Sequence, residues 1–229
     1  MHAVVLSGGL THDFPATTAC LVAELDAVGL TSEVHTDVDA ALGALPGAAL
    51  LVVNALRWTM TAPEVPERYR VQAAVEGASP SSGERAAFDA HLAGGGGLLA
   101  MHTAPICFDD WPEWADALGA RWVWGHSQHP PLGPPVEVAV CGQHEIVAGV
   151  EGFTIVDEVY GDLEFTAAVD PLLQAAQPDE RRRVMPLLWA REHGAARVVY
   201  DALGHHPASY AVPEHAGIVR RAIRWAGRA

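Results

Sequence analysis

The chain lacks lysine altogether, so every basic side chain in it is an arginine. Its 229 residues hold 28 Asp and Glu against 14 Arg, a formal net charge of -14 at pH 7. A field of this sign repels phosphate backbones and anionic lipid surfaces. Nucleic acid and the membrane surface are therefore not expected as partners.

Cysteine and long apolar runs are scarce as well. Cys20, Cys107 and Cys141 are far apart and form no CxxC motif, which argues against a disulfide framework and against a thiolate zinc site. No segment approaches the roughly 18 apolar residues that span a bilayer, and the start MHAVV has no basic leader. We expect a soluble protein in a reducing cytoplasm.

The first half of the chain alternates short apolar runs with helical patterns. The run 48–53 is apolar throughout, as in a strand buried on both faces. Ser81 and Glu84 have the spacing of a capping box at a helix start. Alternation of this kind predicts a parallel sheet. We expect strands at 1–5, 32–35, 48–53 and 98–101, and helices at 15–28, 38–45 and from 82 to the glycines that begin at 94.

The second half changes character after about residue 112. A short helix to Leu118 is followed by segments with period-2 alternation, which predict additional mixed or antiparallel strands. A polar, Pro-containing connection at 57–80 is long enough to suggest a lid or a pocket wall. The length fits one domain over 1–229. The later strands are expected at 136–140, 153–156, 172–175, 185–189 and 197–200, and a closing helix at 214–225.

Polar side chains follow several of the predicted strands. His12 comes after the first, Asn54 after the third with Trp58 nearby, His102 after the fourth, and His205 after the last. Because the carboxyl ends of parallel strands lie at one edge of the sheet, we expect these side chains to gather there.

His102 ends a buried strand at a sharp elbow, the position that holds the nucleophilic cysteine in class I glutamine amidotransferases. An imidazole is a poor acyl-transfer nucleophile beside a thiolate, so cysteine-dependent amide hydrolysis is disfavoured. Cys107, five residues further on, is interpreted as a small buried apolar residue.

Seven fragments occur in order over nearly the whole chain: THDFP (11–15), GGGLLAMHTAP (95–105), WADALGARWVWGH (114–126), QHEI (143–146), DEVY (157–160), PLLWARE (186–192) and ARVVYDALGHH (196–206). Together they resemble the ThuA-like (trehalose utilisation) family. This resemblance implies a flavodoxin-like, class I glutamine amidotransferase-like α/β three-layer sandwich, and a carbohydrate-metabolism protein acting on trehalose-related or keto-disaccharide sugars. Where the family pattern has GHD, this chain has Gly204-His205-His206, which leaves a His–acid pair at that point in doubt.

Asp157 and Glu158 are expected at the end of a short strand, with their carboxylates on opposite faces. We prefer Glu158 as the one that faces the pocket, and we predict His102, His205 and Glu158 as catalytic residues for acid–base chemistry.

Trp122 and Trp124 alternate in a strand-like segment, and their shared face is either a core layer or a platform for a sugar ring. The predicted substrate-binding residues are His12, Asn54, Trp58, His126, His144, Asp157 and Tyr160.

Two other hypotheses remain. One is a sugar-binding or regulatory module without turnover. The other is metal-assisted sugar chemistry with His102, His126 and His205 as ligands, for which His129 and His144 are further imidazole donors. The expected partner is a small carbohydrate, while the cofactor and the oligomeric state, a homo-oligomer included, stay open.

Overall fold

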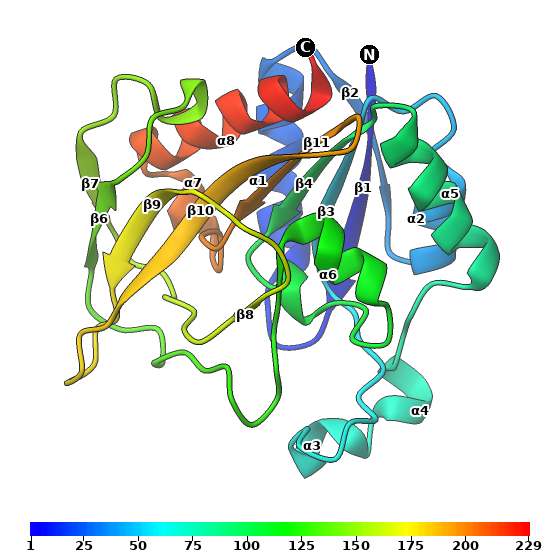
Figure 1. Cartoon of the computed structure of the whole chain (residues 1–229), viewed down its shortest axis with the longest axis horizontal. Helices are drawn as coiled ribbons and strands as arrows, with labels where there is room; N and C mark the ends of the chain where they lie inside the picture. Colours follow the sequence, from blue (N-terminus) through cyan, green and yellow to red (C-terminus); the bar gives the residue numbers. More distant parts are fainter.

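The computed structural model describes all 229 residues, which form one large mixed sheet with helices packed against it (Figure 1). The strand order is β2-β1-β3-β4-β11-β10-β9-β6-β7, and β5 and β8 pair separately. The strands are β1 His2–Gly9, β2 Thr31–His35, β3 Leu50–Leu56, β4 Gly97–Met101, β5 Ala120–Arg121, β6 Val136–Val140, β7 Gly152–Ile155, β8 Glu164–Phe165, β9 Pro171–Ala176, β10 Val184–His193 and β11 Ala196–Asp201.

The helices lie between and beside these strands. In Figure 1, α2 and α5 lie to the right of β1, whereas α1 and α8 lie to its left. The helices are α1 Phe14–Ala27, α2 Val38–Gly43, α3 Glu67–Arg70, α4 Ala73–Glu76, α5 Ser82–Ala93, α6 Pro112–Leu118, α7 Pro207–Tyr210 and α8 Pro213–Gly227, with short 3-10 turns η1 Ala104–Ile106 and η2 Glu145–Val147. None of them has the length and apolar character needed to cross a bilayer.

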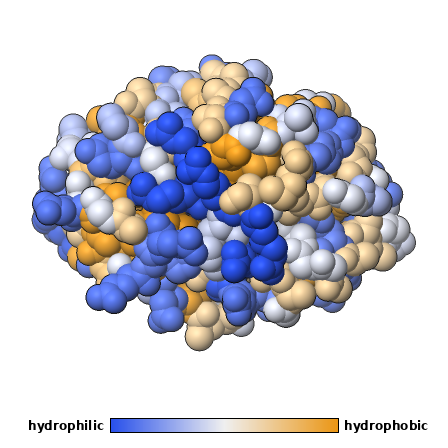
Figure 2. All heavy atoms as spheres, turned by 90° about the horizontal axis from the view of Figure 1, so that it is seen from above, coloured by the Kyte–Doolittle hydropathy of each residue, from blue (hydrophilic) through white to orange (hydrophobic).

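The two halves of the sheet follow the predicted division. β2, β1, β3, β4 and β11 are parallel to their neighbours in this part of the sheet. β10, β9, β6 and β7 continue the sheet through antiparallel pairs, which places the additional strands in the C-terminal half as expected. Figure 2 looks onto the end where the parallel strands begin, and hydrophilic side chains gather near the middle of that face. The site described below lies at the other end of these strands.

One core cluster of 56 buried residues joins both halves, and a second cluster of six packs near the strand ends. β3 is buried along its whole length, which the apolar run had indicated. The second cluster consists of Phe14, Leu56, Trp58, Met60, Ile106 and Tyr160, and the half-buried Trp122 and Trp124 pack against it.

The capping-box interpretation of Ser81 and Glu84 is wrong. Ser81 does precede α5, but its side chain makes no capping hydrogen bond. In a capping box the backbone N–H of Ser81 would donate a hydrogen bond to the side chain of Glu84. Here it donates to the carboxylate of Asp39 instead, at 2.9 Å. A long-range partner has therefore replaced the local one.

The connection at 57–80 contains two short helices, α3 and α4, which project from the body in Figure 1. Val71 and Val75 between and within them are exposed. Ala62 and Glu64, at the start of the connection, line a cavity beside α6, so this segment does supply a pocket wall.

Candidate functional site

His102 follows β4 directly and adopts a left-handed backbone conformation, with φ of 40°. This region is uncommon for a residue other than glycine, and here the surrounding backbone fixes it. The His102 N–H donates to the carbonyl of Asp201 at 2.6 Å, and the Tyr200 hydroxyl donates to the carbonyl of His102 at 2.9 Å. The predicted elbow is thus tied to the adjacent strand β11.

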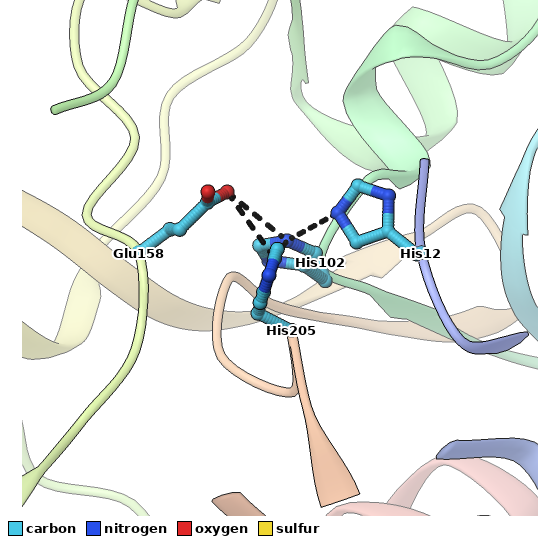
Figure 3. Close-up of side chains that lie close together, drawn as sticks. All are labelled: His12, His102, Glu158 and His205. Carbon is cyan, nitrogen blue, oxygen red and sulfur yellow. Dashed lines mark hydrogen bonds and ion pairs between the residues drawn. The ribbon is translucent and has the colours of Figure 1, made fainter. Parts of the chain in front are cut away.

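The imidazole of His102 is oriented by a single backbone acceptor. Its Nδ1 lies 2.7 Å from the carbonyl oxygen of Ala202, which can only accept, so Nδ1 carries a proton. Nε2 therefore points toward the cluster shown in Figure 3. There it lies 3.2 Å from His12 Nε2, 3.2 Å from His205 Nδ1 and 3.3 Å from the hydroxyl of Tyr160.

Glu158 closes the cluster from the other side (Figure 3). Its Oε2 lies 3.5 Å from His102 Nε2 and 3.4 Å from His205 Nδ1, while Oε1 lies 3.3 Å from His129 Nδ1. The Glu158 side chain is only 7% exposed, whereas that of His205 is 20% exposed. The prediction that Glu158 faces the pocket agrees with this placement, and one carboxylate contacts three imidazoles.

Asp157 has a different role from the predicted substrate contact. Its carboxylate accepts hydrogen bonds from the backbone N–H groups of Gly204 and His205, at 2.8 and 3.3 Å, and from the hydroxyl of Ser209 at 2.6 Å. These bonds hold the loop that carries His205, and the Asp157 side chain is buried. The segment 157–160 is also irregular rather than a strand end, and the two carboxylates contact different groups.

Burial and mutual charge shift the pKa values of the clustered side chains in different directions. Burial, together with the neighbouring His102 and His205, lowers the pKa of His12 to about 4. Burial also opposes charge on His102, but hydrogen bonding to Glu158 and the nearby carboxylates outweigh it and raise its pKa. Burial would raise the pKa of Glu158, yet hydrogen bonds from His102 and His205 hold it below its usual range. The pair of His102 and Glu158 thus favours the charged form of both groups.

Tyr160 is the remaining predicted binding residue that joins the cluster. Its hydroxyl is fully buried at His102, and burial raises its pKa well above the ordinary value, so it remains protonated. It can donate a hydrogen bond at that position.

Four predicted binding residues lie elsewhere. Asn54 is inside β3, which extends to Leu56 and past the predicted end, and its amide donates to the hydroxyls of Thr17 and Thr18 in α1, each at 2.9 Å. Trp58 is fully buried in the second core cluster.

The other two are histidines. His126 lines a separate cavity of about 270 Å³ next to Tyr160. His144 precedes η2, accepts from the N–H of Ile146 and packs against Trp225 of α8 with ring centres 4.9 Å apart. The metal hypothesis with His126 as a ligand is therefore not supported by this placement.

Two residues have a larger part in the site than the sequence suggested. His12 contacts the central imidazole directly, with its Nε2 3.2 Å from His102 Nε2. His129 contacts Glu158 and packs on Tyr160, with ring centres 5.3 Å apart. The only sequence signal for His129 was its spacing from His126 in GHSQHPP, and that spacing does not tell which imidazole turns inward.

The four side chains of Figure 3 form a group that could hold a divalent metal ion. Ligand atoms of His12, His102, Glu158 and His205 all lie within 4.8 Å of one another. Tetrahedral ligands about 2.0–2.1 Å from an ion stand roughly 3.3 Å apart. His102 Nε2 lies at a similar distance, 3.2–3.5 Å, from the nearest ligand atoms of His12, His205 and Glu158. The Nδ1–H bond from His102 to Ala202 is the outer contact that orients a metal-binding imidazole. The donor set of three nitrogens and a carboxylate suits zinc or a similar ion.

The fold and the site define an α/β protein with a histidine–carboxylate centre at the carboxyl edge of parallel strands. The chain belongs to the trehalose utilisation family, ThuA, whose sequence model matches residues 3–226. The family resemblance read from the sequence is thereby confirmed. A comparison with curated proteins gave no match.

Solved structures share the fold at low sequence identity. A ThuA-like protein from Parabacteroides merdae is 16% identical with a TM-score of 0.77, over 99% of this chain and 90% of that one. One from Bacteroides uniformis is 17% identical with a TM-score of 0.64, over 99% and 91%. A β-galactosidase from Rahnella sp. R3 is 14% identical with a TM-score of 0.62, over 98% of this chain and 31% of that enzyme. At these identities the likeness concerns the fold alone.

Proposed function

We propose that this protein is an enzyme of carbohydrate metabolism that acts on trehalose-related or keto-disaccharide sugars at the His102–Glu158–His205 cluster. The observation that carries the proposal is the convergence on His102 Nε2 of two further imidazoles, a carboxylate and a phenol, all within 3.5 Å. Membership of the trehalose utilisation family supports the substrate class. The scaffold is a flavodoxin-like three-layer sandwich, because the parallel order β2-β1-β3-β4-β11 is the doubly wound 2-1-3-4-5 order.

The chemistry is general acid–base catalysis. In a keto sugar the carbonyl acidifies the adjacent C–H bond, and a base that removes this proton together with an acid at the glycosidic oxygen allows elimination. His102 and His205 transfer the protons, and Glu158 holds both imidazoles in place. The elbow carries no thiol, and the nearby Cys107 is buried with a pKa raised to about 12 by that burial, so it supplies no thiolate nucleophile.

The test separates catalysis from binding. Purified protein is incubated with trehalose and with its oxidised keto form, and product formation and ligand affinity are both measured. We expect His102→Ala to reduce product formation by at least about 100-fold, the scale of one acid–base group, while affinity changes little. His193→Ala, a histidine on β10 outside the cluster, is the matched control. Sugar binding without turnover in the unaltered protein would instead identify a binding or regulatory module.

A second candidate is the metal-assisted form of the same chemistry, favoured by the ligand distances above. His12, His102, His205 and Glu158 would hold the ion, which would polarise a sugar carbonyl or hydroxyl oxygen. Elemental analysis of the purified protein decides between the two. One equivalent of metal, lost together with activity on chelation and restored with it, supports this candidate; a substoichiometric content with chelator-resistant activity rejects it.

We propose a cytoplasmic location as well. All three cysteines are free, and Cys141 is exposed, as a reducing compartment allows.

A further inference from the structure

A second cavity, separate from the histidine cluster, lies between the start of the 57–80 connection, η1, α6 and residues 121–124. Its volume is about 410 Å³, within the range of small-molecule sites. Four of the seven tryptophans of the chain line it, namely Trp111, Trp114, Trp122 and Trp124. For a chain with 7% aromatic residues this is a strong local concentration.

The indoles differ in how they are held. Trp111 and Trp114 are buried and nearly parallel, with ring centres 6.4 Å apart. Trp122 and Trp124 are half-buried, and their rings meet at 66° with centres 5.9 Å apart. Packing therefore fixes the floor of the cavity, while two indoles keep part of their surface accessible. An exposed indole face suits the C–H face of a sugar ring.

The charged groups at the cavity are mainly acidic. Glu64 and Asp109 line it together with one arginine, Arg121, whose guanidinium is paired with Glu164. Asp109 accepts from the N–H and hydroxyl of Thr59, at 2.7 and 3.0 Å, whereas Glu64 is exposed beside Gly125. Free carboxylates accept hydrogen bonds from hydroxyl groups and repel phosphate or carboxylate ligands. A neutral polyhydroxylated ligand fits this lining best.

Trp122 connects the cavity to the histidine cluster. While it lines the cavity, its ring centre lies 5.2 Å from that of Tyr160 and 6.1 Å from that of His129. Tyr160 contacts His102, and His129 contacts Glu158. One indole thus borders the aromatic cavity and also packs against the two residues next to the histidine cluster.

We infer that the cavity is a binding subsite for a neutral pyranosyl ring, the second sugar unit of a substrate whose reacting unit lies at the histidine cluster. This inference rests on the proposed function and narrows it, since the preferred substrate is then a disaccharide rather than a monosaccharide. The accessible indoles stack on the C–H face of the ring, and Glu64 accepts a hydroxyl hydrogen.

Binding is tested directly, without turnover, by titrating trehalose and methyl α-D-glucopyranoside while following tryptophan fluorescence and calorimetric heat. We expect Trp124→Ala to weaken binding of both sugars at least about tenfold, and Glu64→Ala to weaken it about threefold to tenfold. Because Trp124 also packs on Trp58, the surface change Glu64→Ala provides evidence that does not depend on the core. Glu151→Ala, an exposed carboxylate before β7, is its matched control and should bind as the unaltered protein does.

The outcomes separate this inference from the proposed function. Binding that survives His102→Ala but is weakened by Glu64→Ala and Trp124→Ala supports the subsite, even if no sugar is converted. Binding unchanged in both cavity variants, or no binding of either sugar, overturns it. Binding of 4-nitrophenol in place of the sugars overturns the pyranosyl assignment too and indicates an aromatic occupant. Product formation that is lost in His102→Ala but normal in both cavity variants rejects the subsite and leaves the proposed function standing.

Discussion

At the scale of single residues, the adjacent carboxylates of Asp157 and Glu158 are both buried but make different contacts. Glu158 faces the cluster, while Asp157 accepts backbone and hydroxyl hydrogens that fix the loop of His205. The carboxylates are neighbours in the chain, so only the conformation of the segment decides which one meets the imidazoles. Asp157 therefore positions the loop that carries His205.

A second buried pair lies below that loop. His215 Nε2 is 3.1 Å from Asp201 Oδ2, and its Nδ1 donates to the carbonyl of Ser209 at 2.9 Å. Burial lowers the pKa of His215, but the charge of Asp201 and the hydrogen bonds outweigh it, so the net pKa is raised. Asp157 adds to this effect, and the phenol of Tyr210 packs against the ring.

This pair gives a prediction on pH and stability. A raised pKa in the folded state contributes stability that is fully present below the unfolded value of about 6.5 and is lost as the pH rises through the folded pKa. We therefore expect the unaltered protein to exceed His215→Gln in unfolding free energy by an amount that falls as the pH rises above about 6.5 and through the raised folded pKa. Urea unfolding at several pH values measures it. An excess that is constant or grows with pH would contradict the assignment of a protonated His215.

At the scale of elements, the start of β4 and the end of α8 approach so closely that only glycine fits at position 97. A Cβ placed on Gly97 would lie 2.2 Å from the carbonyl oxygen of Ala226. Gly97 is the first residue of β4, which leads to His102, and Ala226 lies in the last turn of α8. The obstacle to a Cβ is a backbone atom, which cannot rotate away as a side chain can.

We expect Gly97→Ala to lower the free energy of unfolding by about 1–3 kcal/mol, the usual cost of overpacking. Gly83→Ala is the matched control, because its Cβ would meet nothing closer than 4.0 Å and alanine favours a helix, so the change should be neutral or stabilise by up to about 1 kcal/mol. Denaturant midpoints of the two variants measure the difference. Equal midpoints would mean that α8 and β4 are further apart than described.

At the scale of the whole molecule, the large core cluster spans the parallel and antiparallel halves. It contains Val52 and Leu99 of the first half and Leu173 and Leu188 of the second. Since no boundary divides these side chains, we propose a single domain over residues 1–229.

Such a domain should unfold in one cooperative step. We expect the urea transitions followed by tryptophan fluorescence and by far-ultraviolet circular dichroism to coincide. The seven tryptophans lie at 58, 111, 114, 122, 124, 189 and 225, so fluorescence reports from both halves. Two separated transitions would show instead that the antiparallel part folds as its own unit.

The sequence by itself determined the order and kind of the main elements, the change from parallel to antiparallel strands, and the family. It also placed His12, His102 and His205 at one edge, because residues that directly follow parallel strands meet there whatever the details of packing. These conclusions depend on local periodicity and on the order of motifs along the chain, and both can be obtained from the sequence alone.

The tertiary structure decided which polar groups meet. Asn54 turns toward α1 because β3 continues two residues beyond it, and His144, which follows β6, packs against α8. His129 reaches Glu158 across a loop, and Ser81 binds Asp39, 42 residues away, in place of Glu84. Such contacts join residues remote in the chain, and their geometry depends on strand length and loop path, which local patterns leave undetermined.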